Sequence, residues 1–362
     1  MILIGRTLGR YFSLRFTKVI LAVFLTVFVL VYTLDFVELL RRAGETPGAS
    51  AGLMARLALF RTPAVAELVL PFAVLFGSTA ALLQLSRKLE LVVARSAGIS
   101  AWQFLQPAIL VATLIGILSI TVYNPGSAQL KQKASEIEAR VFARSTQSSG
   151  KDLWLRQRSI DGQAIIRAEG IIEGTTTLTG VTIFTFDDKG AFLERIEAPE
   201  ATLREGYWEL KEARLLSATQ EPQIYDVYMM ASTLEASQVR QSFTSPDSIP
   251  FWSLPDVINR TERAGLDATR YQIQYQSLLA RPLLLIAMVF VAASVSLRFF
   301  RFGGVAKMVL GGVAAGFVLY VIQQVMEDLG ASGFIRPVVA AWFPAVVGTL
   351  LGILALLYQE DG

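Results

Sequence analysis

Residues 17–40, TKVILAVFLTVFVLVYTLDFVELL, form an apolar run whose only charged residues are Lys18, Asp35 and Glu38. A helix of about 20 residues crosses the roughly 30 Å of hydrocarbon in a bilayer, so this run is long enough to span a membrane. Similar runs recur five more times along the chain. We therefore predict six transmembrane helices, at residues 17–40, 56–85, 101–123, 272–297, 304–326 and 335–357.

The composition agrees with this prediction and excludes several kinds of chemistry. Hydrophobic residues make up 53% of the 362 residues and charged residues 17%, unlike an average soluble domain. The chain contains no cysteine and no histidine, which excludes disulfides, thiol nucleophiles, Ser-His-Asp triads and zinc sites with the usual ligands. It contains no GxxxxGK[ST] phosphate loop, and its net charge of +3 does not indicate a nucleic-acid partner. We expect no catalytic residue, metal site or cofactor in this chain.

The stretch between the third and fourth predicted spans is polar. From residue 151 onward, short alternating runs are separated by turn dipeptides such as Glu205-Gly206, a pattern typical of antiparallel strands. The expected strands are Asp152–Arg158, Gln163–Glu169, Leu178–Phe186, Phe192–Ala198, Ala201–Arg204, Tyr207–Leu216 and Ile224–Ser232. This spacing favours a sandwich or jelly roll, in which Val181, Ile183 and the Phe184/Phe186 pair need a facing sheet or a ligand to cover them.

The prediction divides the chain into three parts. Residues 1–123 hold three spans, residues 124–270 hold an all-β, jelly-roll-like domain with flanking helical segments, and residues 271–362 hold three more spans.

Lysines and arginines in the short connections indicate the orientation. They precede the first span and lie between spans two and three and spans four and five: Arg6, Arg10, Arg15, Lys18, Arg87, Lys88, Arg95, Arg298, Arg301 and Lys307. Because such residues favour the cytoplasmic side, we expect both termini in the cytoplasm and residues 124–270 outside. Arg41 and Arg42 then fall on the outer side, against the trend.

The most informative short stretch is Ser86–Ser100, SRKLELVVARSAGIS. Its apolar residues fall on one helical face, and Gly98 is a natural helix stop. The residues alone allow two interpretations. Residues 86–98 form either an amphipathic helix lying in the headgroup region or a coupling helix whose Glu90 docks into a cytoplasmic ATPase.

Within that stretch, Glu90–Ser100 (ELVVARSAGIS) resembles the coupling segment of the LptF/LptG permease family. The resemblance extends over nearly the whole chain, because that family has six spans with a β-jelly-roll between spans three and four. Further stretches fit the LptG branch best: Phe36–Gly44 (FVELLRRAG), Asp152–Trp154 (DLW) and Ala268–Gln272 (ATRYQ).

The resemblance implies a permease subunit of an ATP-driven ABC transporter in the inner membrane of a Gram-negative cell. The family extracts lipopolysaccharide from the outer leaflet and passes it to a periplasmic β-jelly-roll bridge towards the outer membrane. The implied partners are a cytoplasmic ABC ATPase dimer (LptB-like) that binds ATP and Mg²⁺, an LptF-like sister permease, and LptC-like and LptA-like jelly-roll proteins. Residues assigned to ATPase coupling are Glu90, Arg87, Arg95 and Gly98.

The outer end of the first span is the candidate lipid-binding site. Glu38 can pair with Arg42 at i,i+4, and arginines can also snorkel to the interface. Arginine forks bind phosphate, which lipopolysaccharide carries, and the resemblance implies that Arg41 and Arg42 face the lipid cavity beside Glu38. Relatives can carry another basic residue about two turns earlier, where this chain has Asp35.

Two further features lie inside the spans. A central acidic side chain costs about 2.5–3.5 kcal/mol on insertion scales, so we expect Glu67 to face protein or water. Its spacing of six from Arg61 places the two on different helix faces. Gly312 and Gly316 have the GxxxG spacing of close helix packing, and in the family spans one and five line the interface with the sister permease. We assign these glycines to that interface, as part of a lateral gate.

Two alternative functions remain open at this stage. The chain could be the permease of another ABC exporter with lipoprotein or peptide cargo, although such exporters usually have four spans. It could also be a non-transporting envelope scaffold, in which case no ATPase would bind it.

Overall fold

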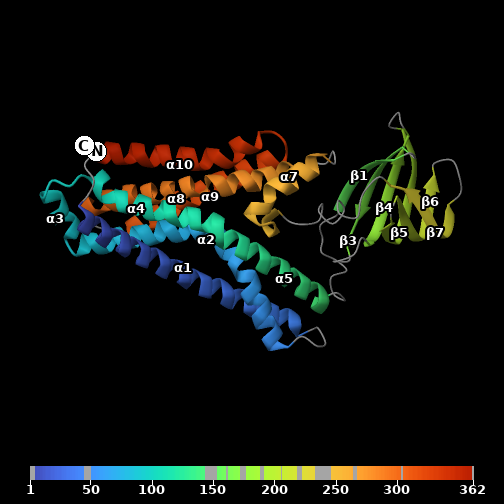
Figure 1. Ribbon diagram of the computed structural model, residues 1–362, viewed down its shortest axis with the longest axis horizontal. Helices are drawn as coiled ribbons and strands as arrows, with labels where there is room; N and C mark the ends of the chain where they lie inside the picture. The colour runs from blue at the N-terminus through green and yellow to red at the C-terminus, as the bar shows by residue number, and fades with distance from the viewer. Residues whose placement is uncertain are drawn as a thin grey trace. The chain divides into compact units, whose positions relative to one another are not determined.

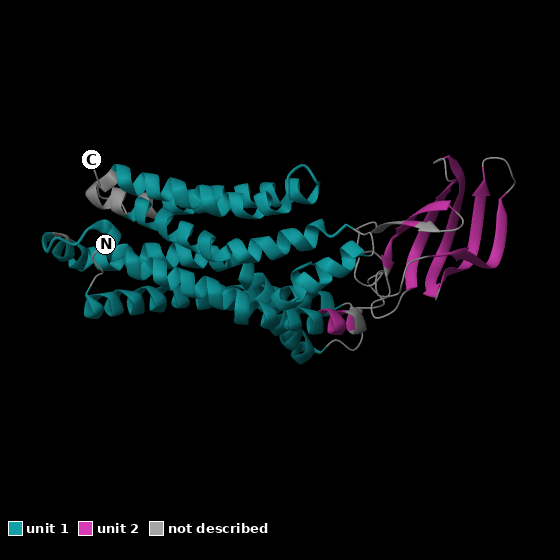
Figure 2. Ribbon diagram, turned by 45° about the horizontal axis from the view of Figure 1, so that its top comes forward, with its two compact units in different colours: residues 1–134, 246–362 teal, residues 135–245 magenta. Residues whose placement is uncertain are grey.

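The computed structural model describes residues 5–44, 50–142, 153–159, 162–171, 177–187, 191–204, 206–217, 222–232, 246–263, 267–302 and 305–360. The chain forms two compact units (Figure 2): a helical unit of Met1–Ala134 with Pro246–Gly362, and a second unit of Ser135–Ser245.

The helical unit confirms the six predicted spans, because the described residues contain six helices long and apolar enough to cross a membrane. The helices are α1 (Arg6–Ala43), α2 (Ala51–Arg87), α3 (Glu90–Ser96), α4 (Ala101–Leu118), α5 (Asn124–Phe142), α7 (Leu254–Arg263), α8 (Thr269–Phe302), α9 (Val305–Ala331) and α10 (Pro337–Glu360), with a π-helix at Ser119–Tyr123 and 3₁₀ turns at Pro246–Ser248 and Phe251–Ser253. α1 and α2 extend well beyond the apolar runs that predicted them.

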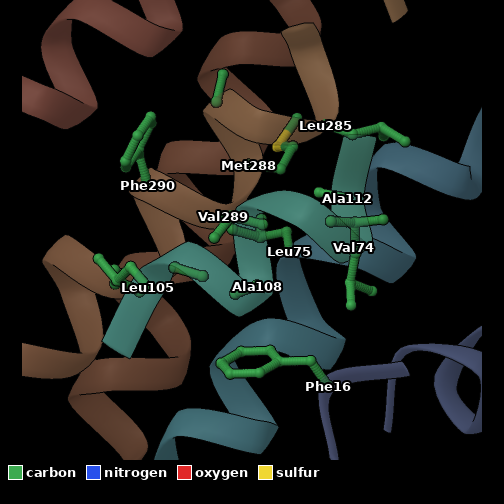
Figure 3. Close-up of a cluster of buried hydrophobic side chains, with 14 of the residues drawn as sticks. Phe16, Val74, Leu75, Leu105, Ala108, Ala112, Leu285, Met288, Val289 and Phe290 are labelled. Atoms are coloured by element: carbon green, nitrogen blue, oxygen red, sulfur yellow. The ribbon is translucent and has the colours of Figure 1, made fainter. Parts of the chain in front are cut away.

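The core of this unit is built around α8, which packs against α2, α4, α9 and α10. Figure 3 shows part of it, where side chains of α1, α2, α4 and α8 meet: Phe16, Val74, Leu75, Leu105, Ala108, Ala112, Leu285, Met288, Val289 and Phe290. Glycine permits two close helix contacts. A Cβ on Gly77 would lie 2.6 Å from Ile20 Cα, and one on Gly116 would lie 2.6 Å from Pro282 Cα. Small residues of this kind let membrane helices approach closely.

The ends of the helices lie at two opposite ends of the bundle (Figure 1). The start of α1, helix α3 and the end of α10 lie at one end of the bundle, and the end of α1 and helix α7 lie at the other. The side chains of Arg298, Arg301 and Lys307 lie outside the described part of the chain.

Apart from the end of α5, the described residues of the second unit form β-strands, as predicted. Its strands are β1 (Leu153–Ser159), β2 (Gly162–Ala168), β3 (Gly170–Ile171), β4 (Thr177–Phe186), β5 (Phe192–Arg204), β6 (Tyr207–Ser217) and β7 (Gln223–Ala231). In the described residues they form one antiparallel sheet in the order β1-β2-β4-β5-β6-β7, with β3 also paired to β4. The two strands predicted at 192–198 and 201–204 are one continuous strand, β5.

Irregularities on three neighbouring strands lie at one level of this sheet. Gly180 in β4 has a φ of +60°, and Glu212 in β6 has a φ of +51°. Between them, β5 carries Pro199, which has no N–H to donate. Regular pairing resumes on either side, at Glu197 with Arg214 and at Glu200 with Lys211. The register is the same on both sides, so the pairing is interrupted here without the extra residue of a β-bulge.

The sheet closes on itself through Gln157 of β1. The Gln157 Oε1 atom accepts hydrogen bonds from Trp208 Nε1 at 3.2 Å and Ser232 Oγ at 2.8 Å, and its Nε2 donates to Ala231 O at 3.2 Å. Since β1 and β7 are the opposite ends of the strand order, these contacts roll the sheet around one apolar interior. Val181 and Ile183 are buried in that interior, so the same sheet supplies the covering surface.

Phe184 and Phe186 lie on the other face of β4, where both are half-buried. Arg195 lies 5.9 Å from the Phe184 ring centroid, and Phe186 meets Phe192 edge-on. The neighbouring strand β5 therefore covers part of this pair.

Gln157→Leu is expected to loosen this closure, because it leaves Trp208 Nε1 and Ser232 Oγ buried without their acceptor. A buried polar group left unpaired costs about 1–3 kcal/mol, a cost that applies here to Trp208 Nε1. Hydrogen–deuterium exchange on the full-length protein should show faster exchange in β1 and β7. Gln223→Leu, which removes only an acceptor for the Tyr225 hydroxyl at an exposed position, serves as control. Unchanged exchange in Gln157→Leu would show that another contact closes the sheet.

Candidate functional site

The C-terminal end of α1 carries two arginines held by one carboxylate. Glu38 accepts from Arg41 Nε at 2.9 Å and Arg41 Nη2 at 2.8 Å, and from Arg42 Nε at 2.9 Å. The predicted Glu38–Arg42 pair is therefore present, and Arg41 joins it. The side chains remain 73% exposed at Arg41 and 51% exposed at Arg42. Glu38 thus gathers two accessible guanidinium groups that could exchange their carboxylate partner for a phosphate.

Asp35, one turn earlier, pairs with Arg61 of α2, with 3.6 Å between Arg61 Nη2 and Asp35 Oδ1. This pair could not be predicted from local spacing, because the two residues lie on different helices. Arg61 brings a guanidinium group from α2 to the level of α1 that Asp35 occupies.

Glu67 of α2 faces protein, as predicted, and it does not pair with Arg61. It is 6% exposed and forms an ion pair with Arg281 of α8. It also accepts from Asn124 Nδ2 at 2.9 Å and Ser127 Oγ at 2.7 Å. Sequence reasoning missed Arg281. The available signal was a lone charged residue inside the fourth apolar run, which requires a partner in a membrane.

The predicted coupling segment contains a short helix, α3, that follows a sharp break. α2 ends at Arg87, whose side chain is exposed, and Leu89 has a φ of +60°. α3 then begins at Glu90. Gly98, with a φ of +83°, follows the helix end, a geometry that glycine adopts readily. The side chain of Arg95 lies outside the described part of the chain.

α3 is only partly covered by its own chain. Leu91 and Ala94 are buried in this chain, whereas Leu89, Val92 and Val93 are 44–64% exposed. Glu90 Oε1 accepts a hydrogen bond of 3.2 Å from the Tyr11 hydroxyl of α1. An exposed apolar patch beside a positioned carboxylate is a surface suited to a protein partner.

α1 and α9 are the least covered of the long helices. Within the most apolar 18 residues of each helix, 6% of the residues of α1 and 17% of those of α9 are buried. The corresponding share is 56% for both α2 and α8. Gly312 and Gly316 are buried and face α2 of the same chain, so within this chain they do not lie on the surface that was assigned to the sister permease. A methyl group on Gly316 would overlap the Leu75 side chain, and Phe72 of α2 contacts Tyr320 of α9 with ring centroids 5.6 Å apart.

These features define a class of protein: a multi-pass membrane protein with a β-domain inserted between its third and fourth spans. The described residues contain no group of three or more acidic, histidine or cysteine side chains that could hold a metal ion.

The family model described as "Lipopolysaccharide export system permease LptF/LptG" matches residues 10–358, and the chain belongs to this family. It is 24% identical over 340 residues to the lipopolysaccharide export system permease protein LptG of Escherichia coli (strain K12), covering 90% of this chain and 91% of the relative. It is 23% identical over 365 residues to the LptG protein of Haemophilus influenzae, covering 97% and 96%. The resemblance stated from the sequence is confirmed, and family and helices together indicate a multi-pass protein of the inner membrane.

Proposed function

We propose that this chain is one permease half of an ATP-driven exporter that extracts lipopolysaccharide from the outer leaflet of the inner membrane. The observation that carries the proposal is the match of the family over residues 10–358, in a chain with three spans on either side of a β-domain. Expulsion of lipid, without bond chemistry at this chain, is the step it performs.

The proposed orientation places both termini and α3 in the cytoplasm and the β-domain in the periplasm. It is supported by the bundle end that the start of α1, the end of α10 and α3 share (Figure 1). The helix ends in this part of the bundle carry four arginines, Arg6, Arg10, Arg15 and Arg87. Basic residues favour the cytoplasmic side of a membrane.

An ABC ATPase dimer, LptB-like, docks on α3 and supplies the ATP and Mg²⁺ sites. Glu90 enters the ATPase groove, and the exposed Leu89, Val92 and Val93 pack against its walls. Arg87 and Arg95 flank the contact, and Gly98 sets the angle at which α3 leaves it. Closure of the ATPase dimer on binding ATP moves α3 and the helices that follow it.

An LptF-like sister permease faces α1 and α9, whose side chains the chain leaves mostly uncovered. Gly312 and Gly316 place no side chain on the face of α9 that contacts α2, and α9 slides along α2 on this face when the lateral gate opens. Arg41 and Arg42, gathered by Glu38, hold the lipid phosphates, and the rolled sheet receives the acyl chains. LptC-like and LptA-like jelly-roll proteins continue the bridge by adding strands to a sheet edge.

Gentle detergent purification of the tagged chain, followed by mass spectrometry of proteins and lipids, tests this proposal. We expect an ABC ATPase, a second six-span subunit and lipopolysaccharide to be retained together. Retention of the ATPase with lipoproteins or peptides in place of lipopolysaccharide would indicate another ABC exporter. Absence of any ATPase, under conditions that keep other ABC complexes intact, would favour the scaffold function.

A further inference from the structure

A buried polar cluster ties three helices together in the half of the bundle nearest the end of α1. Both carboxylate oxygens of Glu67 are occupied: Oε1 by Arg281 and Asn124, and Oε2 by Ser127. The side chains of Glu67 and Arg281 are only 8% and 13% exposed. A buried charge pair with filled hydrogen bonds holds its elements in one geometry, because separating the partners leaves charges without solvent.

A π-helix positions the donors of this cluster. Ser119–Tyr123 forms one π-turn between α4 and α5, which turns the following residues around the helix axis. Asn124 and Ser127 are the next buried polar residues after it, at 2% and 3% exposure. The Tyr123 hydroxyl donates to Pro63 O of α2 at 2.9 Å. π-turns of this kind occur frequently at functional sites.

Asn124 connects the cluster to the segment that returns from the β-domain. Its Nδ2 donates to Glu67, and its Oδ1 accepts from Phe251 N at 2.9 Å. The chain leaves the helical unit after Ala134 and re-enters it at Pro246. Asn124 therefore joins the outgoing and the returning segments to the same buried carboxylate.

Further contacts run along these two segments, residues 121–132 and 247–252, which we call the stalk. Trp252 Nε1 donates to Thr121 O at 3.3 Å, and Gln132 Nε2 donates to Ser248 O at 2.8 Å. Lys131 pairs with Asp247 at 3.3 Å. The two segments are thus held side by side along their length, with the buried cluster at the base.

We propose that Glu67, Arg281 and Asn124 are positioning residues for lipid hand-over. They anchor the stalk in the helical unit, so that lipid expelled from the membrane helices enters the β-domain. The inference rests on the proposed export function and adds to it residues that touch neither the ATPase nor the lipid phosphates. The cluster acts on the last step, transfer, while lipid capture takes place elsewhere in the chain and ATP hydrolysis takes place on the partner ATPase.

The test separates capture from transfer in the complete transporter, reconstituted with its ATPase, its sister permease and lipopolysaccharide. A photocrosslinking amino acid replaces Val37 on α1 in one preparation and Tyr228 in the β-domain in another. In the Glu67→Gln/Arg281→Gln variant we expect Val37 crosslinks and ATP hydrolysis to stay near wild type. Tyr228 crosslinks should fall by at least about five-fold, the lower end of the usual range for coupling between sites. Arg204→Gln/Glu209→Gln, which neutralises an exposed pair, is the matched control and should change neither.

A covalent lock provides the second measurement. The chain has no cysteine, so Gln132→Cys/Ser248→Cys can be joined by a short bifunctional thiol reagent. We expect the lock to restore Tyr228 crosslinks in the Glu67→Gln/Arg281→Gln background and to leave them intact in the wild-type background. If the neutralised variant does not fold, Tyr228 crosslinking in the locked wild-type background alone tests the inference.

Three results would overturn the inference: normal Tyr228 crosslinks in the neutralised variant, equal loss at Val37 and Tyr228, or loss of hand-over when the stalk is locked. Absence of lipid crosslinks at Val37 in the wild-type complex would instead reject the proposed function itself.

Discussion

Glu90→Ala is expected to abolish ATP-driven lipopolysaccharide release while leaving the chain folded and inserted. Removing one partner of a buried charged contact at an interface costs about 2–5 kcal/mol, which corresponds to about 30-fold or more in affinity for the ATPase. Glu90 is the first residue of α3 and carries its carboxylate beside exposed Leu89, Val92 and Val93, so the loss falls on docking. Retention of the ATPase by the tagged chain and lipid release from proteoliposomes are the two measurements.

Tyr11→Phe is the matched control for this variant. It removes the hydroxyl that donates to Glu90 Oε1 and leaves the carboxylate free to meet a partner. If the effect of Glu90→Ala arises from the loss of this intrachain bond, Tyr11→Phe will reproduce it. Normal ATPase retention and normal lipid release in Glu90→Ala would remove Glu90 from the coupling site.

The spans and the end of α3 could be predicted because their signals are local. A run of about 20 apolar residues specifies a membrane helix whatever surrounds it. Gly98 adopts a φ of +83° after α3, and a glycine following an amphipathic helix indicates such an end. The start of α3 could not be placed in the same way, since the break rests on Leu89 with a φ of +60°, a conformation leucine rarely adopts.

The partner of Glu67 could not be predicted, because it comes from a distant part of the chain. Helical spacing correctly separated Glu67 from Arg61, yet it gave no means of choosing among charges in other spans. Arg281 lies 214 positions further along the chain. Asn124 reaches Glu67 only after a π-turn, which no local pattern indicated.

The interruption of pairing in the β-sheet could not be predicted from the sequence alone. The expected strands Phe192–Ala198 and Ala201–Arg204 lie on either side of Pro199, a residue type that interrupts strand hydrogen bonding. In the structure the strand continues through Pro199, and the interruption is shared with Gly180 and Glu212 on the neighbouring strands. A proline aligned with irregular residues on both neighbouring strands marks a shared interruption of pairing, but that alignment depends on register, which could not be read from the sequence.

Arg41→Glu combined with Arg42→Glu is expected to abolish lipopolysaccharide crosslinking at the outer end of α1. Each basic residue near an anionic lipid surface contributes about 1 kcal/mol. Losing two therefore costs about 2 kcal/mol, about 30-fold in affinity, and reversing their charge adds repulsion from the lipid phosphates. The measurement is photocrosslinking to lipopolysaccharide from position Val37, one turn before Arg41 on α1 and 58% exposed.

Conservative replacements separate the guanidinium fork from its charge. Arg41→Lys/Arg42→Lys keeps both charges and removes the bidentate geometry that suits phosphate, so we expect crosslinking between the wild-type and the reversed level. Arg204→Glu, at an exposed arginine that also pairs with a glutamate, should leave crosslinking unchanged. Full crosslinking in the reversed variant would show that the two arginines only snorkel at the interface and that lipid phosphates bind elsewhere. A lysine variant equal to wild type would show that charge alone is sufficient, because a lysine ammonium cannot replace the two parallel N–H donors that Arg41 presents to Glu38.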